Sequence, residues 1–90
     1  MTNEEWARLI PSHLRESLDR YRIHGIPTGG CLRAVLAGDL FAAFESADPT
    51  TTAAMPAIAR YVRTTMPNEI YGSHAIVDAW IAAKLEELRS

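Results

Sequence analysis

Proline and glycine residues divide this chain into short segments, and this division restricts the fold more than any other feature. Pro11 ends the first segment, a turn at Gly25 ends the second, and Pro49 and Pro67 bound the fourth. Because proline lacks an N–H and clashes with the preceding helical turn, helices begin at it or end before it. The apolar residues between these breaks have helical spacing, and no stretch alternates as a strand would. We therefore expect one all-α domain that covers residues 1–90.

The expected architecture is a compact bundle of four main helices preceded by a short N-terminal helix. Thr2 and Glu5 have the spacing of a capping box at the start of the short helix. Asp48 and Ser73 are caps for the last two helices, and the proline after Asp48 suits a first helical turn. Pro56 lies inside the fourth segment, so we expect a kink there or a separate first turn. The predicted helices cover residues 3–9, 11–24, 28–47, 49–66 and 74–88.

The third predicted helix carries the longest apolar face of the chain. Asp39 falls inside that face, and a buried carboxylate needs a partner, so we expect it to meet an arginine, a hydroxyl group or the N–H groups of another helix start. Phe41 and Phe44 project to the flanks of the face, which predicts either extra core or an interface with other helices or another subunit. The residues expected to be buried are Leu32, Val35, Leu36, Leu40, Ala43 and Ala47 here, and Val77, Trp80, Ile81, Leu85 and Leu88 on the last helix.

The Gly/Pro loop that leads into this helix is the only candidate ligand site in the sequence. Backbone N–H groups at a helix start attract anions, and an arginine one turn further on would assist. Two glycines before a helix are also typical of a tight connection between packed helices. A helix-turn-helix is a third interpretation, in which residues 28–33 would begin a recognition helix. The candidate ligand-binding residues are Arg22, His24, Thr28, Gly29, Gly30 and Arg33.

Composition argues against several classes of partner. The formal net charge is −2, so no overall positive field attracts a phosphate backbone, and we expect no DNA binding. Eight of the nine basic residues are arginines, which suit bidentate contact with phosphate or carboxylate. No apolar run is long enough to span a membrane, and the N-terminal residues do not resemble an export signal. We expect a cytoplasmic protein.

The side chains that carry catalysis or bind metals are sparse. Cys31 is the only cysteine, so no internal disulfide or cysteine-based zinc site forms, and we expect it to serve packing. The three histidines do not have metal-ligand spacing. His74 and Asp78 are four residues apart, and we expect a surface contact between them rather than a catalytic pair. We therefore predict a non-enzymatic protein without metal or cofactor.

The Gly/Pro loop and the segments after it in the chain resemble a known group. The matching residues, in chain order, are Gly25-Ile26-Pro27-x-Gly29-Gly30-x-Leu32-x-Ala34-Val35-Leu36, Asp39-Leu40, Ala47-Asp48, Pro67, Gly72-Ser73 and Trp80-Ile81. This pattern resembles that of a group of small uncharacterised proteins from tailed phages and prophages. The resemblance spans most of residues 18–81. Cys31, Gly38 and Arg63 depart from its pattern, where an aromatic residue, Asn and Tyr are usual.

This resemblance implies a phage accessory protein in the host cytoplasm, and such proteins often counter bacterial defence. Our first hypothesis is that the chain binds and sequesters a nucleotide-type immune signal at the six candidate ligand-binding residues. The alternative is a protein-interaction inhibitor of a host defence complex, or a phage adaptor, with Phe41, Phe44 and Trp6 as anchors. Because the aromatic residues are spread over most segments, we also predict a homodimer or higher homo-oligomer through the side of the third helix that carries the two phenylalanines.

Overall fold

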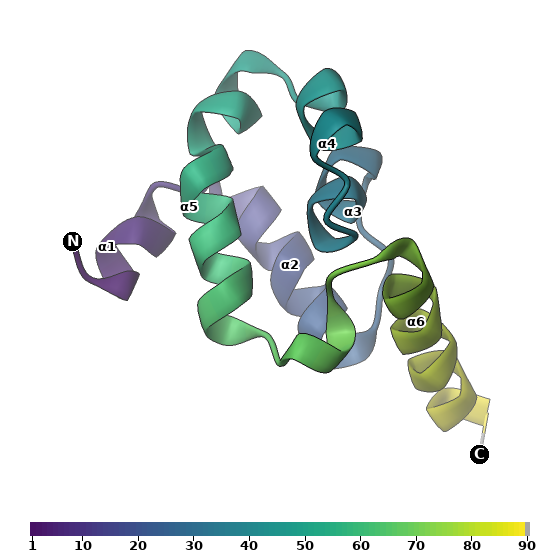
Figure 1. Cartoon of the computed structure of the whole chain (residues 1–90). Coiled ribbons are helices and arrows are strands. Elements are labelled where there is room, and N and C mark those ends of the chain that lie inside the picture. Colours follow the sequence, from purple (N-terminus) through teal and green to yellow (C-terminus); the bar gives the residue numbers. More distant parts are fainter. Residues whose placement is uncertain (90) are drawn as a thin grey trace.

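Six α-helices and one short 3-10 helix make up the computed structural model, which describes residues 1–89. In Figure 1, α5 stands beside α1, α3 and α4 lie across from α5, α2 passes behind, and α6 extends away from the body. No strand occurs within the described range, which confirms the all-α class. The elements are α1 (Asn3–Arg8), α2 (Ser12–His24), α3 (Gly30–Leu36), α4 (Leu40–Ser46), α5 (Pro49–Thr65), η1 (Asn68–Ile70) and α6 (His74–Arg89).

The predicted helix caps are present as hydrogen bonds. Thr2 and Glu5 form both bonds of the capping box at 3.2 Å. The Asp48 carboxylate accepts the Thr51 N–H at 2.7 Å, and Ser73 Oγ accepts the backbone N–H three residues later at 3.1 Å. α5 runs without interruption through its internal proline, so the first turn is not a separate element. Each of these ends is therefore defined by local chemistry.

The prediction of one helix over residues 28–47 is wrong, because the chain turns at Gly38. Gly38 has φ +71°, and the N–H groups of Gly38 and Asp39 donate to the carbonyls of Val35 and Ala34 at 3.1 and 2.8 Å. This pair of bonds is the Schellman motif, which ends a helix with a glycine in the left-handed region. Asp39 then caps α4 by accepting the Ala42 N–H at 3.2 Å.

This break changes which side chains the chain buries. Leu40, expected in the core, is 63% exposed, because α4 starts in a new direction instead of continuing the apolar face of α3. The end of α6 differs as well: Leu85 and Leu88 are exposed, the latter by 82%. The helix extends beyond the body there, as Figure 1 shows, so the apolar face continues where no other helix covers it.

The main core joins α2, α3, α5 and α6 around Tyr21. Its hydroxyl donates to the Ile70 carbonyl at 2.6 Å, and Trp80 Nε1 donates to the Tyr21 carbonyl at 2.7 Å. The Cα radius of gyration is 12.8 Å, near the ~12 Å of a compact chain of this length. The compact bundle is thus confirmed, with six helices in place of five. The wholly buried large side chains are Leu18, Tyr21, Leu36, Ile58 and Val77.

A second, smaller cluster packs α3, α4 and α5 against one another. Its buried members are Ala34, Ala43 and Met55, with Cys31 half-buried beside them. The Cys31 thiol donates to the Ala43 carbonyl at 3.4 Å, in agreement with its expected packing role. Because two of the three buried members are alanines, little side-chain volume fills the space between α5 and the α3–α4 corner.

Candidate functional site

The predicted anion site at the Gly/Pro loop is open. Gly29 caps α3 without a side-chain hydrogen bond, and both Gly29 and Gly30 are exposed. A methyl group added at either glycine would meet nothing within 4 Å. The Thr28 hydroxyl donates to the adjacent Gly29 carbonyl at 3.2 Å. The start of α3 is therefore accessible to solvent.

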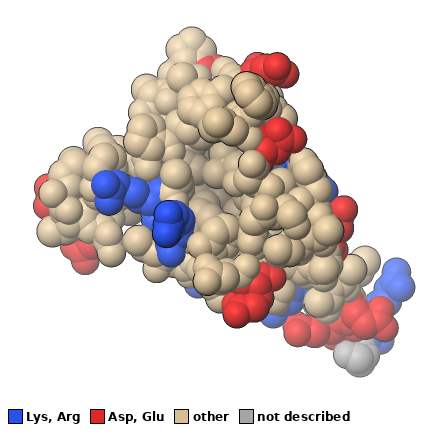
Figure 2. Space-filling model, viewed as in Figure 1, with Lys and Arg blue, Asp and Glu red and all other residues tan. Residues whose placement is uncertain are grey.

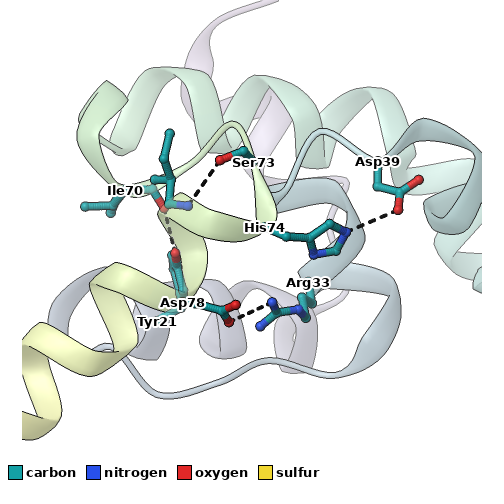
Figure 3. A network of polar contacts seen from close by, with 8 residues as sticks. Tyr21, Arg33, Asp39, Ile70, Ser73, His74 and Asp78 are labelled. Atoms are coloured by element: carbon teal, nitrogen blue, oxygen red, sulfur yellow. Dashed lines mark hydrogen bonds and ion pairs between the residues drawn. The ribbon is translucent and has the colours of Figure 1, made fainter.

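The basic residues predicted for that site point to three different places. Arg33 reaches α6, where its Nη2 lies 2.7 Å from Asp78 Oδ1 (Figure 3). Arg22 lies 3.6 Å from Asp19, and its buried Nε has no hydrogen-bond partner among residues 1–89. His24 lines a shallow hollow with the end of α6, next to Lys84. The structure does not bring the six candidate residues together, since Arg33 pairs with Asp78 on α6, Arg22 lies beside Asp19 on its own helix, and His24 lies at the far end of α6.

The polar contacts between α3, α4 and α6 also differ from the sequence prediction. His74 does not pair with Asp78: its Nε2 lies 3.2 Å from Asp39 Oδ2, across the α3–α4 turn (Figure 3). The hydrogen bond with His74, together with the N–H of Ala42, lowers the pKa of Asp39. The expectation of a buried Asp39 that meets another helix start is wrong, because its side chain is 39% exposed, caps α4, which follows it directly, and pairs with a histidine. These contacts fix the corner between α3 and α4 relative to α6.

An apolar groove lies between α5 and the α3–α4 corner, and we call it the α5 groove. It consists of two adjoining hollows, of about 190 and 220 Å³, that share Val35, Gly38 and Ala59. Phe44 lines the groove at the α4 end, and Arg63 lines it at the other end. Gly38 has no side chain, and the side chains of Ala43 and Ala59 are small, so the space stays unfilled. Figure 2 shows this hollow in the middle of a largely uncharged face, with basic side chains gathered over α5 and α1.

The outer side of α4 presents large apolar side chains to solvent next to this groove. Phe41 is 80% exposed, Leu40 63% and Phe44 46%. Together with Glu45 they line a shallow hollow of their own, and we call these four residues the Phe41 surface. The largest exposed apolar patch of a soluble protein is often a functional surface.

Sequence reasoning named two members of this surface but missed the groove. Phe41 and Phe44 were proposed as anchors from their place on the flanks of a predicted helix. The groove depends on contacts between segments distant in the chain, and its only signal in the sequence is the small size of Gly38, Ala43 and Ala59. Trp6, the third proposed anchor, is half-buried, and the Arg60 guanidinium lies over its ring at 4.5 Å.

The described part of the chain shows neither a group of metal-ligating side chains nor a helix long and apolar enough to cross a bilayer. No protein-family model, curated protein or solved structure matches this chain.

Proposed function

We propose that this chain is a non-enzymatic protein that acts by binding another protein through the Phe41 surface. The exposure of Phe41, Phe44 and Leu40 on one short helix beside an apolar groove carries this proposal. Aromatic side chains at the centre of an interface supply most of its binding energy. A groove that adjoins them gives the partner a cavity to fill.

The exposed area of the two phenylalanines limits what the Phe41 surface alone contributes to binding. A phenylalanine side chain buries about 200 Å², so the exposed parts of Phe41 and Phe44 offer about 250 Å² together. At about 25 cal/mol per Å², covering them contributes about 6 kcal/mol. This gain lies within the range of the entropic cost of association, so measurable affinity needs the groove to be filled as well.

The resemblance to small phage proteins gives this function a setting. In this setting the partner is a host defence protein in the bacterial cytoplasm. The chain covers the surface of that protein and so blocks its activity. The setting rests on the resemblance, whereas the binding rests on the Phe41 surface. Evidence against one of these two parts would therefore not count against the other.

Sequestration of a nucleotide-type signal is a second candidate, favoured by the open backbone N–H groups at the start of α3. Arg33 is held by Asp78, so a phosphate there has to compete with a carboxylate for the guanidinium. Calorimetry of the protein against cyclic di- and trinucleotides and cyclic ADP-ribose isomers tests this candidate. Heat that disappears in Gly30→Val, whose side chain would cover the helix start, supports it. The absence of heat with all of them rejects it.

The protein-binding proposal is tested by affinity capture from host lysate followed by calorimetry with the purified partner. We expect one stoichiometric partner, with affinity reduced at least tenfold by Phe41→Ala. The matched control is Leu88→Ala, which removes an equally exposed apolar side chain from the end of α6. Equal affinity of the Phe41 variant, or equal losses in both variants, would contradict the proposal.

A further inference from the structure

The α5 groove has about the length of α4. Met55, Ala59 and Arg63 line it at successive turns of α5, a distance of eight residues or about 12 Å. α4 is a helix of seven residues, about 10 Å long, and its exposed side carries Phe41 and Phe44. The groove therefore matches the exposed side of α4 in length, and its two hollows, of about 190 and 220 Å³, have the size of side chains such as that of Phe41.

The charges at the two ends complement each other. Glu45 lies beside the phenylalanines on the Phe41 surface, and Arg63 lies at the opposite end of the groove. Within residues 1–89 neither side chain takes part in an ion pair. A segment that fills the groove with an aromatic helix and brings a carboxylate to Arg63 has the chemistry of α4 itself.

We propose that a second copy of this chain covers the groove in a two-fold dimer. Phe41 of each copy enters the α5 groove of the other, and Glu45 of each copy pairs with Arg63 of the other. In a two-fold interface every contact occurs twice, so an apolar centre between an acidic and a basic end is self-complementary. The dimer uses the surface assigned above to a partner protein, so that partner displaces the second copy, but the dimer does not depend on the partner's existence.

The area indicates a reversible dimer. The four phenylalanines of the two copies contribute about 500 Å², whereas stable interfaces bury about 1,200–2,000 Å² in total. The remaining area has to come from the groove walls and the ends of α4. We expect monomer and dimer to exchange at micromolar concentrations.

Sedimentation equilibrium of the full chain, from micromolar to millimolar concentration, tests the pairing through charge reversal. The wild type should rise from 10.0 kDa toward twice that mass. Glu45→Arg and Arg63→Glu should each weaken dimerisation at least tenfold, because each places like charges opposite each other. A one-to-one mixture of the two variants should dimerise again, since both ion pairs are attractive in the mixed dimer. Glu86→Arg, on the exposed side of α6, is the control and should behave as the wild type.

Circular dichroism establishes first that both variants are folded, and Glu45→Gln with Arg63→Gln replaces a variant that is not. The neutral variants should each weaken the dimer by a smaller factor. A wild type that stays monomeric up to millimolar concentration would overturn the proposal, as would single variants that dimerise normally or a mixture that stays monomeric. A partner whose capture requires Phe41 while the free protein is monomeric would leave the proposed function intact and reject the dimer.

Discussion

Removal of one hydroxyl group from the core, by Tyr21→Phe, should destabilise the protein measurably. Tyr21 has no exposed surface, and its hydroxyl donates a 2.6 Å hydrogen bond to the Ile70 carbonyl. Phenylalanine keeps the ring and its packing but leaves that carbonyl without this donor. A buried acceptor left unsatisfied costs about 1–3 kcal/mol. Since each kcal/mol moves the Tm of a chain of this size by about 4–8 °C, we expect a fall of about 4–24 °C.

The same substitution should change the response to alkaline pH. Burial raises the pKa of Tyr21 to about 12, whereas a tyrosine in an unfolded chain ionises near 10. Between these values the unfolded chain loses a proton that the folded protein keeps, so stability falls as the pH rises from about 10 to about 12. The full difference corresponds to roughly 3 kcal/mol. Phenylalanine cannot ionise, so the stability advantage of the wild type should shrink over this interval.

Urea unfolding followed by circular dichroism, at intervals between pH 7 and pH 12, measures both effects. Tyr71→Phe is the matched control, because the Tyr71 hydroxyl makes an exposed 3.0 Å bond to Asn68. That variant should lie within about 0.5 kcal/mol of the wild type. The reasoning would be refuted by a Tyr21 variant as stable as the wild type at neutral pH, or by a stability difference that does not change between pH 9 and pH 12.

Three further substitutions test the helix ends by urea unfolding. Gly38→Ala should lower the free energy of unfolding by about 1–2 kcal/mol, because φ is +71° and the new Cβ would lie 3.0 Å from the Gly72 carbonyl oxygen. An unchanged urea midpoint would argue against the turn between α3 and α4. Asp48→Ala should lower the stability near neutral pH through loss of the α5 cap. The Thr51 N–H lowers the pKa of Asp48, so this cost should decline as the pH falls below about 4, and a constant cost would contradict the role of the carboxylate. Gly30→Ala should stabilise the protein by about 0.5 kcal/mol, because its position is open and helical, and a loss of stability would show that the loop is packed more tightly than the structure has it.

Local sequence signals predicted most helix ends correctly but failed at Gly38. Caps such as Thr2 and Asp48 act within three residues, so the sequence contains the whole interaction. Gly38 followed by Asp39 is also a local stop and start signal. The apolar spacing on either side fitted one continuous helix equally well, and the choice depends on contacts with Gly72, far along the chain.

The candidate site was less predictable because its charges pair over long distances. Arg33 is 45 residues from Asp78, and the sequence near either residue does not predict their ion pair. The wheel positions of Leu40 and Leu88 place them on apolar faces. Whether another helix covers that part of a face depends on tertiary packing, which here leaves both side chains exposed. Sequence reasoning could therefore name Phe41 and Phe44 as anchors without locating the groove beside them.

A two-dimensional ¹⁵N–¹H NMR spectrum of the labelled protein, recorded with and without the captured partner, tests whether the Phe41 surface is the binding surface. If it is, the amide signals that change should belong to residues 40–45 of α4 and to Val35, Ala59 and Arg63 of the α5 groove. Signals from the start of α3, residues 28–33, should stay in place. Changes confined to that helix start, with α4 and the groove unaffected, would contradict the protein-binding proposal.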